Sequence, residues 1–294
     1  MNNTNLKLLI IGLLLFTFHF IQAQEDSKQT TRYRIACCDW MMLKRQKLGE
    51  FALAKAVGAD GVELDMGPLG NRILFDNQLR DSVQALNFRH VADSLGIKVS
   101  SVAMSGFFAQ NLITRNNYRD LITDCFRTMY YMNATVAFLP LGGCGTAWQT
   151  RGIQRDSLVN RLHTIGEMAL QQGYTVGIRT SVSAKEDIRL LNEVKSEGIK
   201  IYYNFQDAAD AHRDICKELK QLGAKRIIQI HASNTDSVNL REDPDINLPK
   251  IKQTLDGMNW KGWLVIERSR DVKRVKDVKY NFSRNVAFLK EIYN

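Results

Sequence analysis

The feature that most constrains the fold is a regular alternation of short apolar runs with longer amphipathic stretches. The runs are rich in β-branched residues, as strands buried on both faces of a sheet should be. They are Tyr33–Cys38, Gly61–Leu64, Val99–Met104, Thr135–Leu139, Thr175–Ile178, Lys200–Tyr203, Arg226–Ile230 and Gly262–Ile266. The helical stretches between them are Leu48–Val57, Val83–Leu95, Tyr118–Met132, Ser157–Gln171, Lys185–Lys195, Ala209–Leu222, Leu248–Met258 and Phe282–Ile292. This alternation predicts parallel strands joined by right-handed crossovers.

Two architectures fit such a pattern, a closed barrel and an open doubly wound sheet. Glycines typical of helix ends precede several runs, at Gly58, Gly96, Gly173, Gly198 and Gly223. No glycine-rich dinucleotide fingerprint follows the first run, which disfavours the open sheet and a nucleotide cofactor. The sequence therefore predicts one α/β domain over residues 33–294, a single (β/α)₈ TIM barrel.

The first 23 residues have the pattern of a signal peptide. Lys7 precedes a mostly apolar core, Leu8–Ile21, and the small residue Ala23 marks a cleavage point. The core is shorter than the roughly 20 residues of a membrane span, and no cysteine lies nearby for a lipid anchor. We expect an exported protein, periplasmic or secreted, with a polar spacer at residues 24–32 and no membrane insertion after cleavage. Removal of 23 of the 294 residues leaves 271, which suits one large domain.

Charge and cysteine content exclude several other classes. The net charge of +9 is spread along the chain, and its densest patch, Arg268–Lys279, is interrupted by Asp271 and Asp277. This pattern favours a solvated connection over a nucleic-acid site. Five cysteines show no spacing of a disulfide framework, and we interpret most of them as buried apolar residues.

The candidate site residues follow from the fold, because reacting groups in such barrels come from the carboxyl ends of the strands. His231 and Glu267 each come directly after an apolar run, on adjacent strands. They can share a divalent cation (Mn, Zn or Mg), form an acid–base pair, or merely fill the barrel top as an ion pair. The other polar or aromatic candidates at strand ends are Trp40, Glu63, Arg179, Asn204, Asp207, Asn234 and Arg268.

Several segments resemble the xylose isomerase-like sugar isomerases and epimerases. They are Gly58–Leu64, Gly177–Thr180, Tyr203-Asn204, Gln229–His231 and Trp260–Glu267, and the resemblance extends over roughly Tyr33 to Tyr293. It implies a TIM barrel that acts on a small carbohydrate. The superfamily also includes abasic-site endonucleases, but those hold a zinc cluster with many histidines. The mature chain has four histidines, of which we place three, His90, His163 and His212, on helices.

The resemblance implies a metal site whose ligands are only partly present. In the epimerases, Glu, Asp, His and Glu at the ends of strands five to eight hold one divalent metal, and the two glutamates exchange the proton beside the substrate carbonyl. The last two positions match His231 and Glu267, but the first two hold Arg179 and Asn204. The Asn204 amide oxygen is a weak ligand. A guanidinium has no acceptor lone pair and stays protonated, so Arg179 can neither bind a cation nor act as the second base.

Three interpretations remain open. Arg179 can stand in for the metal beside Glu267 and polarise a carbonyl or enediolate oxygen. The pair can instead be a dead site in a non-catalytic carbohydrate-binding barrel. Alternatively, a displaced metal can use His231, Glu267 and a carboxylate such as Asp207 or Glu63. The leading hypothesis is an isomerase/epimerase-type enzyme, or a related keto-sugar lyase or dehydratase, with catalytic Glu267, His231 and Arg179. Its expected substrate is a free sugar, keto-sugar or polyol.

Secondary contacts are predicted for a few further residues. Trp40, Phe107 and Phe108 can stack on a sugar ring or pack in the core. Arg268 and Arg270 can bind an oxyanion or lie in solvent as surface charge. Gly142-Gly143-Cys144-Gly145 forms a flexible loop through which backbone amides can approach a ligand.

Overall fold

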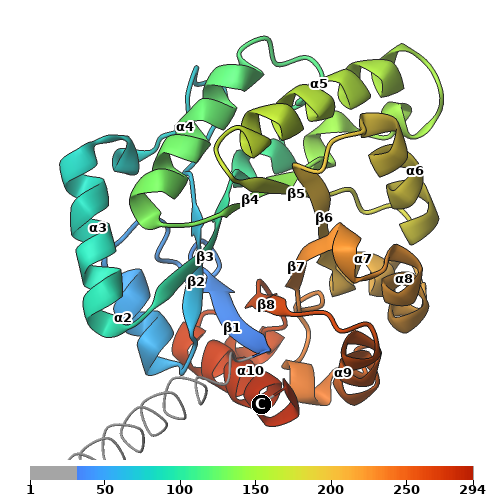
Figure 1. Cartoon of the computed structure of the whole chain (residues 1–294). Helices are drawn as coiled ribbons and strands as arrows, with labels where there is room; N and C mark the ends of the chain where they lie inside the picture. The colour runs from blue at the N-terminus through green and yellow to red at the C-terminus, as the bar shows by residue number, and fades with distance from the viewer. Residues whose placement is uncertain (1–31, 294) are drawn as a thin grey trace, which may run out of the picture. The chain divides into compact units, whose positions relative to one another are not determined.

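The strands close into a parallel eight-stranded barrel. A computed structural model describes residues 32–293 of the chain, and Figure 1 shows helices surrounding the sheet. The strands are β1 (Tyr33–Cys38), β2 (Gly61–Asp65), β3 (Lys98–Ala103), β4 (Val136–Pro140), β5 (Thr175–Arg179), β6 (Ile199–Asn204), β7 (Ile227–His231) and β8 (Gly262–Ile266). Each pairs in parallel with the next, and β1 closes against β8 with Ala36 opposite Val265. The (β/α)₈ prediction is confirmed. Because all strands run parallel, their carboxyl ends lie together at one mouth of the barrel.

The helices lie close to the predicted ranges, with one exception. They are α2 (Gly49–Ala56), α3 (Ser82–Leu95), α4 (Tyr118–Met132), α5 (Ile153–Leu170), α6 (Ala184–Val194), α7 (Phe205–Asp210), α8 (Ile215–Leu222), α9 (Leu248–Gly257) and α10 (Val278–Tyr293). Several end at a residue in the left-handed region, such as Gly96 after α3 (φ 70°), where glycine has no steric penalty.

The single helix expected at Ala209–Leu222 was wrong. His212 has a φ of 52°, which ends the short helix α7, and Asp214 begins α8 by accepting a hydrogen bond from Lys217 N (3.0 Å). His212 therefore lies in a turn, while His90 and His163 lie on α3 and α5 as predicted. Asp214 fixes where the second helix begins, because its side chain accepts a hydrogen bond from a first-turn N–H of α8 that has no partner within that helix.

The core has two parts. One lies between the strands and helices and includes Ile266, which is fully buried on the outer side of the sheet. The other, inside the barrel, is smaller and centres on Phe138 and Tyr202. All five cysteines are buried and unpaired, as their spacing indicated. The interior also holds polar side chains, and these lead to the site.

Two further expectations concern the ends of the chain and the membrane. The predicted signal peptide (1–23) and nearly all of the spacer (24–32) lie outside the described residues. No helix among residues 32–293 has the length and apolarity of a membrane span.

Candidate active site

An arginine with two carboxylate partners occupies the barrel mouth. Arg179 is the last residue of β5, and its Nε and Nη2 donate to Oδ2 (2.8 Å) and Oδ1 (2.6 Å) of Asp207. Its Nη1 donates to Oε2 of Glu267 (3.1 Å), which follows β8 directly. The arginine side chain is 10% exposed and that of Glu267 is 5% exposed. A bidentate pair of this kind fixes the guanidinium plane and holds its charge beside Glu267.

Local structure at the end of β6 explains how Asp207 reaches the arginine. Asn204 ends β6 and caps α7, because its Oδ1 accepts a hydrogen bond from Asp207 N (3.3 Å). Asp207 thus stands in the first turn of a helix, where a carboxylate is favoured. The Asn204 oxygen, which we considered as a weak metal ligand, is committed to this cap. Its amide nitrogen faces the site instead, 3.5 Å from Glu267 Oε2 and 3.4 Å from His231 Nδ1.

His231 is held from below by a buried carboxylate. It is the last residue of β7 and is fully buried, and its Nε2 lies 2.7 Å from Oε1 of Glu63. A carboxylate oxygen accepts hydrogen bonds, so this contact favours the His231 tautomer with its proton on Nε2. The other ring nitrogen, Nδ1, points toward the mouth and lies 3.7 Å from Oε2 of Glu267.

A floor of interior polar side chains fixes Glu63 in turn. Its Oε2 accepts hydrogen bonds from Tyr202 OH (2.6 Å) and Ser101 Oγ (2.7 Å). Gln229 Nε2 donates to both of those hydroxyls, at 2.9 Å each. All four residues of this floor, Glu63, Ser101, Tyr202 and Gln229, are essentially inaccessible to solvent. Both oxygens of Glu63 are hydrogen-bonded, which fixes the carboxylate against His231, whereas Oε1 of Gln229 has no partner among the described residues.

Electrostatics keep the arginine charged and the tyrosine neutral. Burial works to lower the pKa of Arg179, but hydrogen bonding to Asp207 and the charges of Glu267 and Asp207 outweigh it and raise the pKa. Burial, followed by the charge of Glu63, raises the pKa of Tyr202 well above its usual range. The site therefore holds a permanent cation at its mouth and a protonated hydroxyl at its floor.

The side chains at the mouth do not fit a divalent metal at the position that the resemblance implies. Arg179 stands where a ligand carboxylate would be and donates a hydrogen bond to Glu267, one of the two remaining ligand candidates. The Asn204 oxygen faces its helix cap. Within residues 32–293, no three His, Cys, Asp or Glu side chains are arranged to hold a metal ion. A divalent ion would have to displace a paired guanidinium, which repels it.

The displaced-metal arrangement meets a similar difficulty. Asp207 is bound on both oxygens by Arg179, and Glu63 lies on the opposite side of the His231 ring from Glu267. His231 and Glu267 are adjacent, as predicted, but the third carboxylate of that arrangement is engaged elsewhere.

Of the predicted substrate-binding residues, Trp40 and Arg268 are half-buried, whereas the side chain of Asn234 forms hydrogen bonds within its own loop. Trp40 is half-buried and packs against the interior cluster around Phe138 and Tyr202, so it lies at the barrel. Arg268 is half-buried, and its backbone nitrogen donates to Ser233 Oγ. Asn234 is instead used within its loop, where its Nδ2 donates to Asp243 Oδ1 (3.3 Å) and its Oδ1 accepts from Thr235 N.

Several aromatic and glycine residues proved to have packing roles. Phe107 is fully buried against Phe75, whereas Phe108 is 37% exposed and lies under the Arg179 guanidinium at 5.4 Å. The glycine loop forms a 3₁₀ turn, Gly142–Cys144. A Cβ on Gly143 would stand 2.2 Å from the carbonyl oxygen of Gln110, so this glycine permits close backbone packing there.

A second group of acidic residues, Asp39, Asp65 and Glu50, lies beside the loop that carries Trp40. The sequence analysis did not identify these residues as a cluster. Oδ2 of Asp39 accepts hydrogen bonds from Gln46 N (3.0 Å) and Asp65 N (3.2 Å). Burial and the charge of Asp65 raise the pKa of Asp39 to about 7, and burial raises that of Asp65 to about 6. Burial likewise raises the pKa of Glu50 in α2, followed by the charge of Asp39. The sequence feature that could have revealed this cluster is the position of Asp39 and Asp65 at the ends of the neighbouring strands β1 and β2.

The free space beside the arginine is small. The cleft lined by Arg179, Thr180, Tyr203, Asn204 and Asp207, among others, holds about 10 Å³. Neither His231 nor Glu267 lines this cleft, so it is distinct from the open side of the mouth, where a substrate would meet those two residues.

Comparison with known proteins identifies the family to which this barrel belongs. The model of one family, the xylose isomerase-like TIM barrel, matches residues 51–292. The chain belongs to this family. No curated protein matches it in sequence.

Solved structures of several sugar epimerases superimpose over most of the chain. One is D-psicose 3-epimerase with D-tagatose from Clostridium cellulolyticum H10 (TM-score 0.71, 13% identity, 89% of this chain and 99% of that one). Another is 3-keto-D-glucoside 4-epimerase from E. coli in its apo form (TM-score 0.68, 14% identity, 88% and 99%). A third is D-allulose 3-epimerase from Methylomonas sp. with D-allulose (TM-score 0.65, 13% identity, 90% and 98%). At this identity the likeness shows the shared barrel fold.

Proposed function

We propose that this protein is a sugar isomerase/epimerase-type enzyme in which Arg179 replaces the metal of its family. The observation that carries the proposal is the 3.1 Å contact between Arg179 Nη1 and Glu267 Oε2 at the barrel mouth. It puts a permanent cation beside a carboxylate that can accept a proton. Proton abstraction next to a carbonyl needs this combination, because negative charge moves onto the carbonyl oxygen as the proton leaves.

Each residue then has a defined task in the reaction. Glu267 takes the proton from the carbon next to the carbonyl, and the C–H electron pair forms an enediolate whose oxygen is stabilised by Arg179. His231 Nδ1 exchanges a proton with the neighbouring hydroxyl. Glu267 returns its proton to the adjacent carbon, which gives an isomer with all atoms and electrons balanced. Alternatively, protonated Glu267 gives its proton to a departing β-hydroxyl, and the enediolate then loses water, which is the lyase or dehydratase outcome.

The remaining residues hold these groups or the substrate. Asp207 fixes Arg179, and Glu63 orients His231 rather than contacting substrate, because both of its oxygens are bound inside the barrel. Asn204, Trp40 and Arg268 are the proposed substrate contacts, with a free sugar, keto-sugar or polyol as the ligand. We place the enzyme outside the cytoplasm on the signal-like residues 1–23.

A non-catalytic carbohydrate-binding barrel is the second candidate, and one observation favours it. Asp207 and Glu267, the two carboxylates at the mouth, are both ion-paired with Arg179, at 2.6 and 3.1 Å. In this case the arginine only neutralises charge, and sugars bind at the rim without conversion.

Solvent exchange distinguishes the two candidates. The protein is incubated in D₂O with free ketoses, aldoses and keto-sugars, and deuterium incorporation next to the carbonyl is followed by mass spectrometry. An enzyme of the proposed type incorporates deuterium in the presence of EDTA, and Glu267→Gln abolishes it. Glu242→Gln, which removes a surface carboxylate paired with Arg284, serves as the control. Calorimetric sugar binding without exchange would instead support the binding barrel, and exchange only on addition of a metal would contradict the role of Arg179.

A further inference from the structure

A basic pocket lies at the end of the barrel opposite to the proposed active site. It is formed where α6 ends, where β6 begins at Ile199, and in the 3₁₀ turn Ala224–Arg226 before β7. Its volume is about 410 Å³, within the ~300–1,000 Å³ that small-molecule sites occupy. The Asn204 and His231 side chains stand at the other ends of the same two strands, so the pocket is separate from the mouth.

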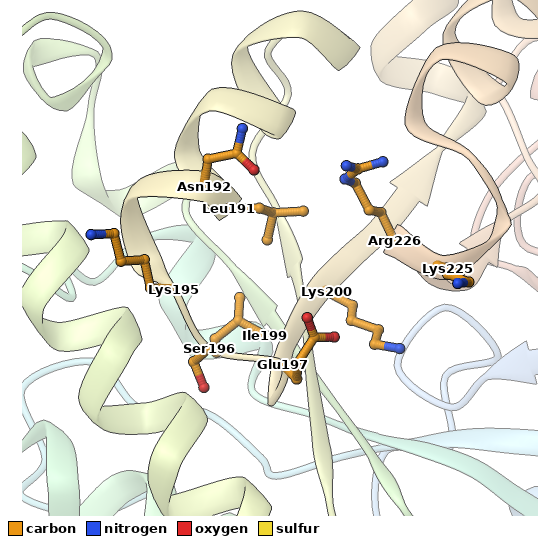
Figure 2. A pocket seen from close by; sticks show the side chains of 9 residues that line it. All are labelled: Leu191, Asn192, Lys195, Ser196, Glu197, Ile199, Lys200, Lys225 and Arg226. Atoms are coloured by element: carbon orange, nitrogen blue, oxygen red, sulfur yellow. The ribbon is translucent and has the colours of Figure 1, made fainter.

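Cations dominate the lining of this pocket. Lys195, Lys200, Lys225 and Arg226 line it, against one carboxylate, Glu197, and apolar walls from Leu191 and Ile199. Figure 2 shows Arg226 and Lys200 on one side, whereas Lys195 extends from the far side of the helix end. Arg226 is anchored, because its Nη1 donates to the carbonyl oxygen of Leu222 (2.9 Å).

These cations are not explained by ion pairing. No salt bridge within residues 32–293 involves Lys195, Lys200 or Lys225. By contrast Lys98, which begins β3 at the same end of the barrel, is paired with Asp93 at 3.7 Å. A cluster of like charges around one hollow raises the local concentration of anions.

Helix ends also do not balance the charge. Helices α6 and α8 both end at this pocket, at Val194 and Leu222, and each C-terminus carries about −0.5 of a charge. Lys195 is left out of the charge count because it extends from the far side of the helix end. The other three cations, Lys200, Lys225 and Arg226, together with Glu197 give a net charge of two positive charges. The two helix ends reduce this excess to roughly one charge. The pocket therefore keeps a net positive potential suited to an oxyanion.

We propose that this pocket binds a small soluble molecule carrying a phosphate, sulfate or carboxylate group. Lys200, Lys225 and Arg226 contact the oxyanion, and Leu191 with Ile199 provides a short apolar wall for the rest of the ligand. No aromatic side chain lines the pocket, so it has no stacking surface for a nucleotide base.

The probes are inorganic phosphate, inorganic sulfate and citrate, measured by isothermal titration calorimetry at constant ionic strength set with sodium chloride. The unmodified protein should bind at least one probe at a single saturable site. Lys200→Glu with Lys225→Glu should weaken that binding at least about tenfold, and the alanine pair Lys200→Ala with Lys225→Ala by less. Lys185→Glu, an exposed lysine at the other end of α6, changes charge without touching the pocket and should leave binding unchanged.

Three results would overturn the proposal. These are no saturable binding of any probe by the unmodified protein, equal weakening by Lys185→Glu, and binding only to vesicles of phosphatidylglycerol and phosphatidylcholine in equal parts. The last result would assign the cations to a membrane surface. Circular dichroism of the variants checks that the fold is kept, and the alanine pair remains informative if the charge reversals do not fold.

Discussion

Arg179 and Asp207 form a bidentate ion pair at the barrel mouth, with Nε–Oδ2 and Nη2–Oδ1 distances of 2.8 and 2.6 Å. The two side chains are 10% and 14% exposed. The pair joins the end of β5 to the first turn of α7, so it orients the guanidinium toward Glu267. This relationship decides whether the mouth can hold a metal, because it fills the ligand position with a fixed cation.

Removing the aspartate charge should destabilise the protein measurably. Asp207→Asn leaves Arg179 with Glu267 as its remaining carboxylate partner, and we expect a loss of about 1–3 kcal/mol in the free energy of unfolding. Urea unfolding measures this loss. Glu291→Gln, which removes the exposed partner of Arg241, should change stability by less than about 1 kcal/mol. Equal effects of the two substitutions would show that the Arg179–Asp207 pair is no stronger than a surface pair.

Replacing the arginine should create a metal site. A divalent ion ~4 Å from a guanidinium is repelled by at least about 4 kcal/mol per unit charge at an effective dielectric of 20. Arg179→Glu should therefore raise the affinity for Mn²⁺ or Zn²⁺, and the double change with Asn204→Asp should raise it further. Calorimetric titration measures both affinities.

Arg270→Glu is the matched control for this experiment, because Arg270 forms a similar half-buried bidentate pair with Asp236 and is not hydrogen-bonded to His231 or Glu267. It should not create a tight site. If the unmodified protein binds one metal per chain and His231→Ala or Glu267→Ala abolishes it, then Arg179 does not fill the ligand position.

The buried Glu63 should determine which nitrogen of His231 carries the proton. With Nε2 hydrogen-bonded to Glu63 at 2.7 Å, we expect ¹⁵N NMR to show Nε2 of His231 protonated. Glu63→Gln presents an amide that can reverse or disorder this hydrogen bond, so the ¹⁵N resonances of His231 should shift. His231→Gln identifies the signals, and Ser101→Ala, which keeps the carboxylate, should change them less. Unaltered His231 resonances in Glu63→Gln would refute the positioning role.

Stability should fall as the pH rises from about 4 to about 7. Burial and the charge of Asp65 raise the pKa of Asp39 to about 7, whereas an unfolded aspartate titrates near 3.9. The folded protein then binds more protons than the unfolded chain across this window, and each pH unit costs up to about 1.4 kcal/mol for one such group. Asp39→Asn should flatten the fall, and Asp120→Asn, on the exposed first turn of α4, should not. Urea unfolding at several pH values checks both slopes, and an unchanged slope in Asp39→Asn would exclude Asp39 as its source.

Export gives a prediction at the N-terminus. If residues 1–23 are a signal peptide, protein purified from its native host begins at or near Gln24. N-terminal sequencing decides this. Recovery of a membrane-bound form that starts at Met1 would contradict it.

The sequence by itself determined the architecture and the candidate positions of the site. Buried parallel strands need apolar side chains on both faces, so each strand is visible as a short apolar run, and the strands at Tyr33–Cys38 and Gly262–Ile266 were predicted to the residue. Strand ends meet at one mouth, which is why Arg179, Asn204, His231 and Glu267 could be grouped before their geometry was known.

Only the tertiary structure decided what each polar side chain contacts. Nothing local indicates that Arg179 pairs with Asp207, that Glu63 lies beneath a histidine 168 residues away, or that the Asn204 oxygen caps a helix. Hydrogen-bonding partners depend on side-chain direction and distance across the barrel, and neither is encoded in apolar periodicity. The pattern of the chain therefore specifies where the strands end, and the packing of the barrel selects which of the groups brought together there bind one another.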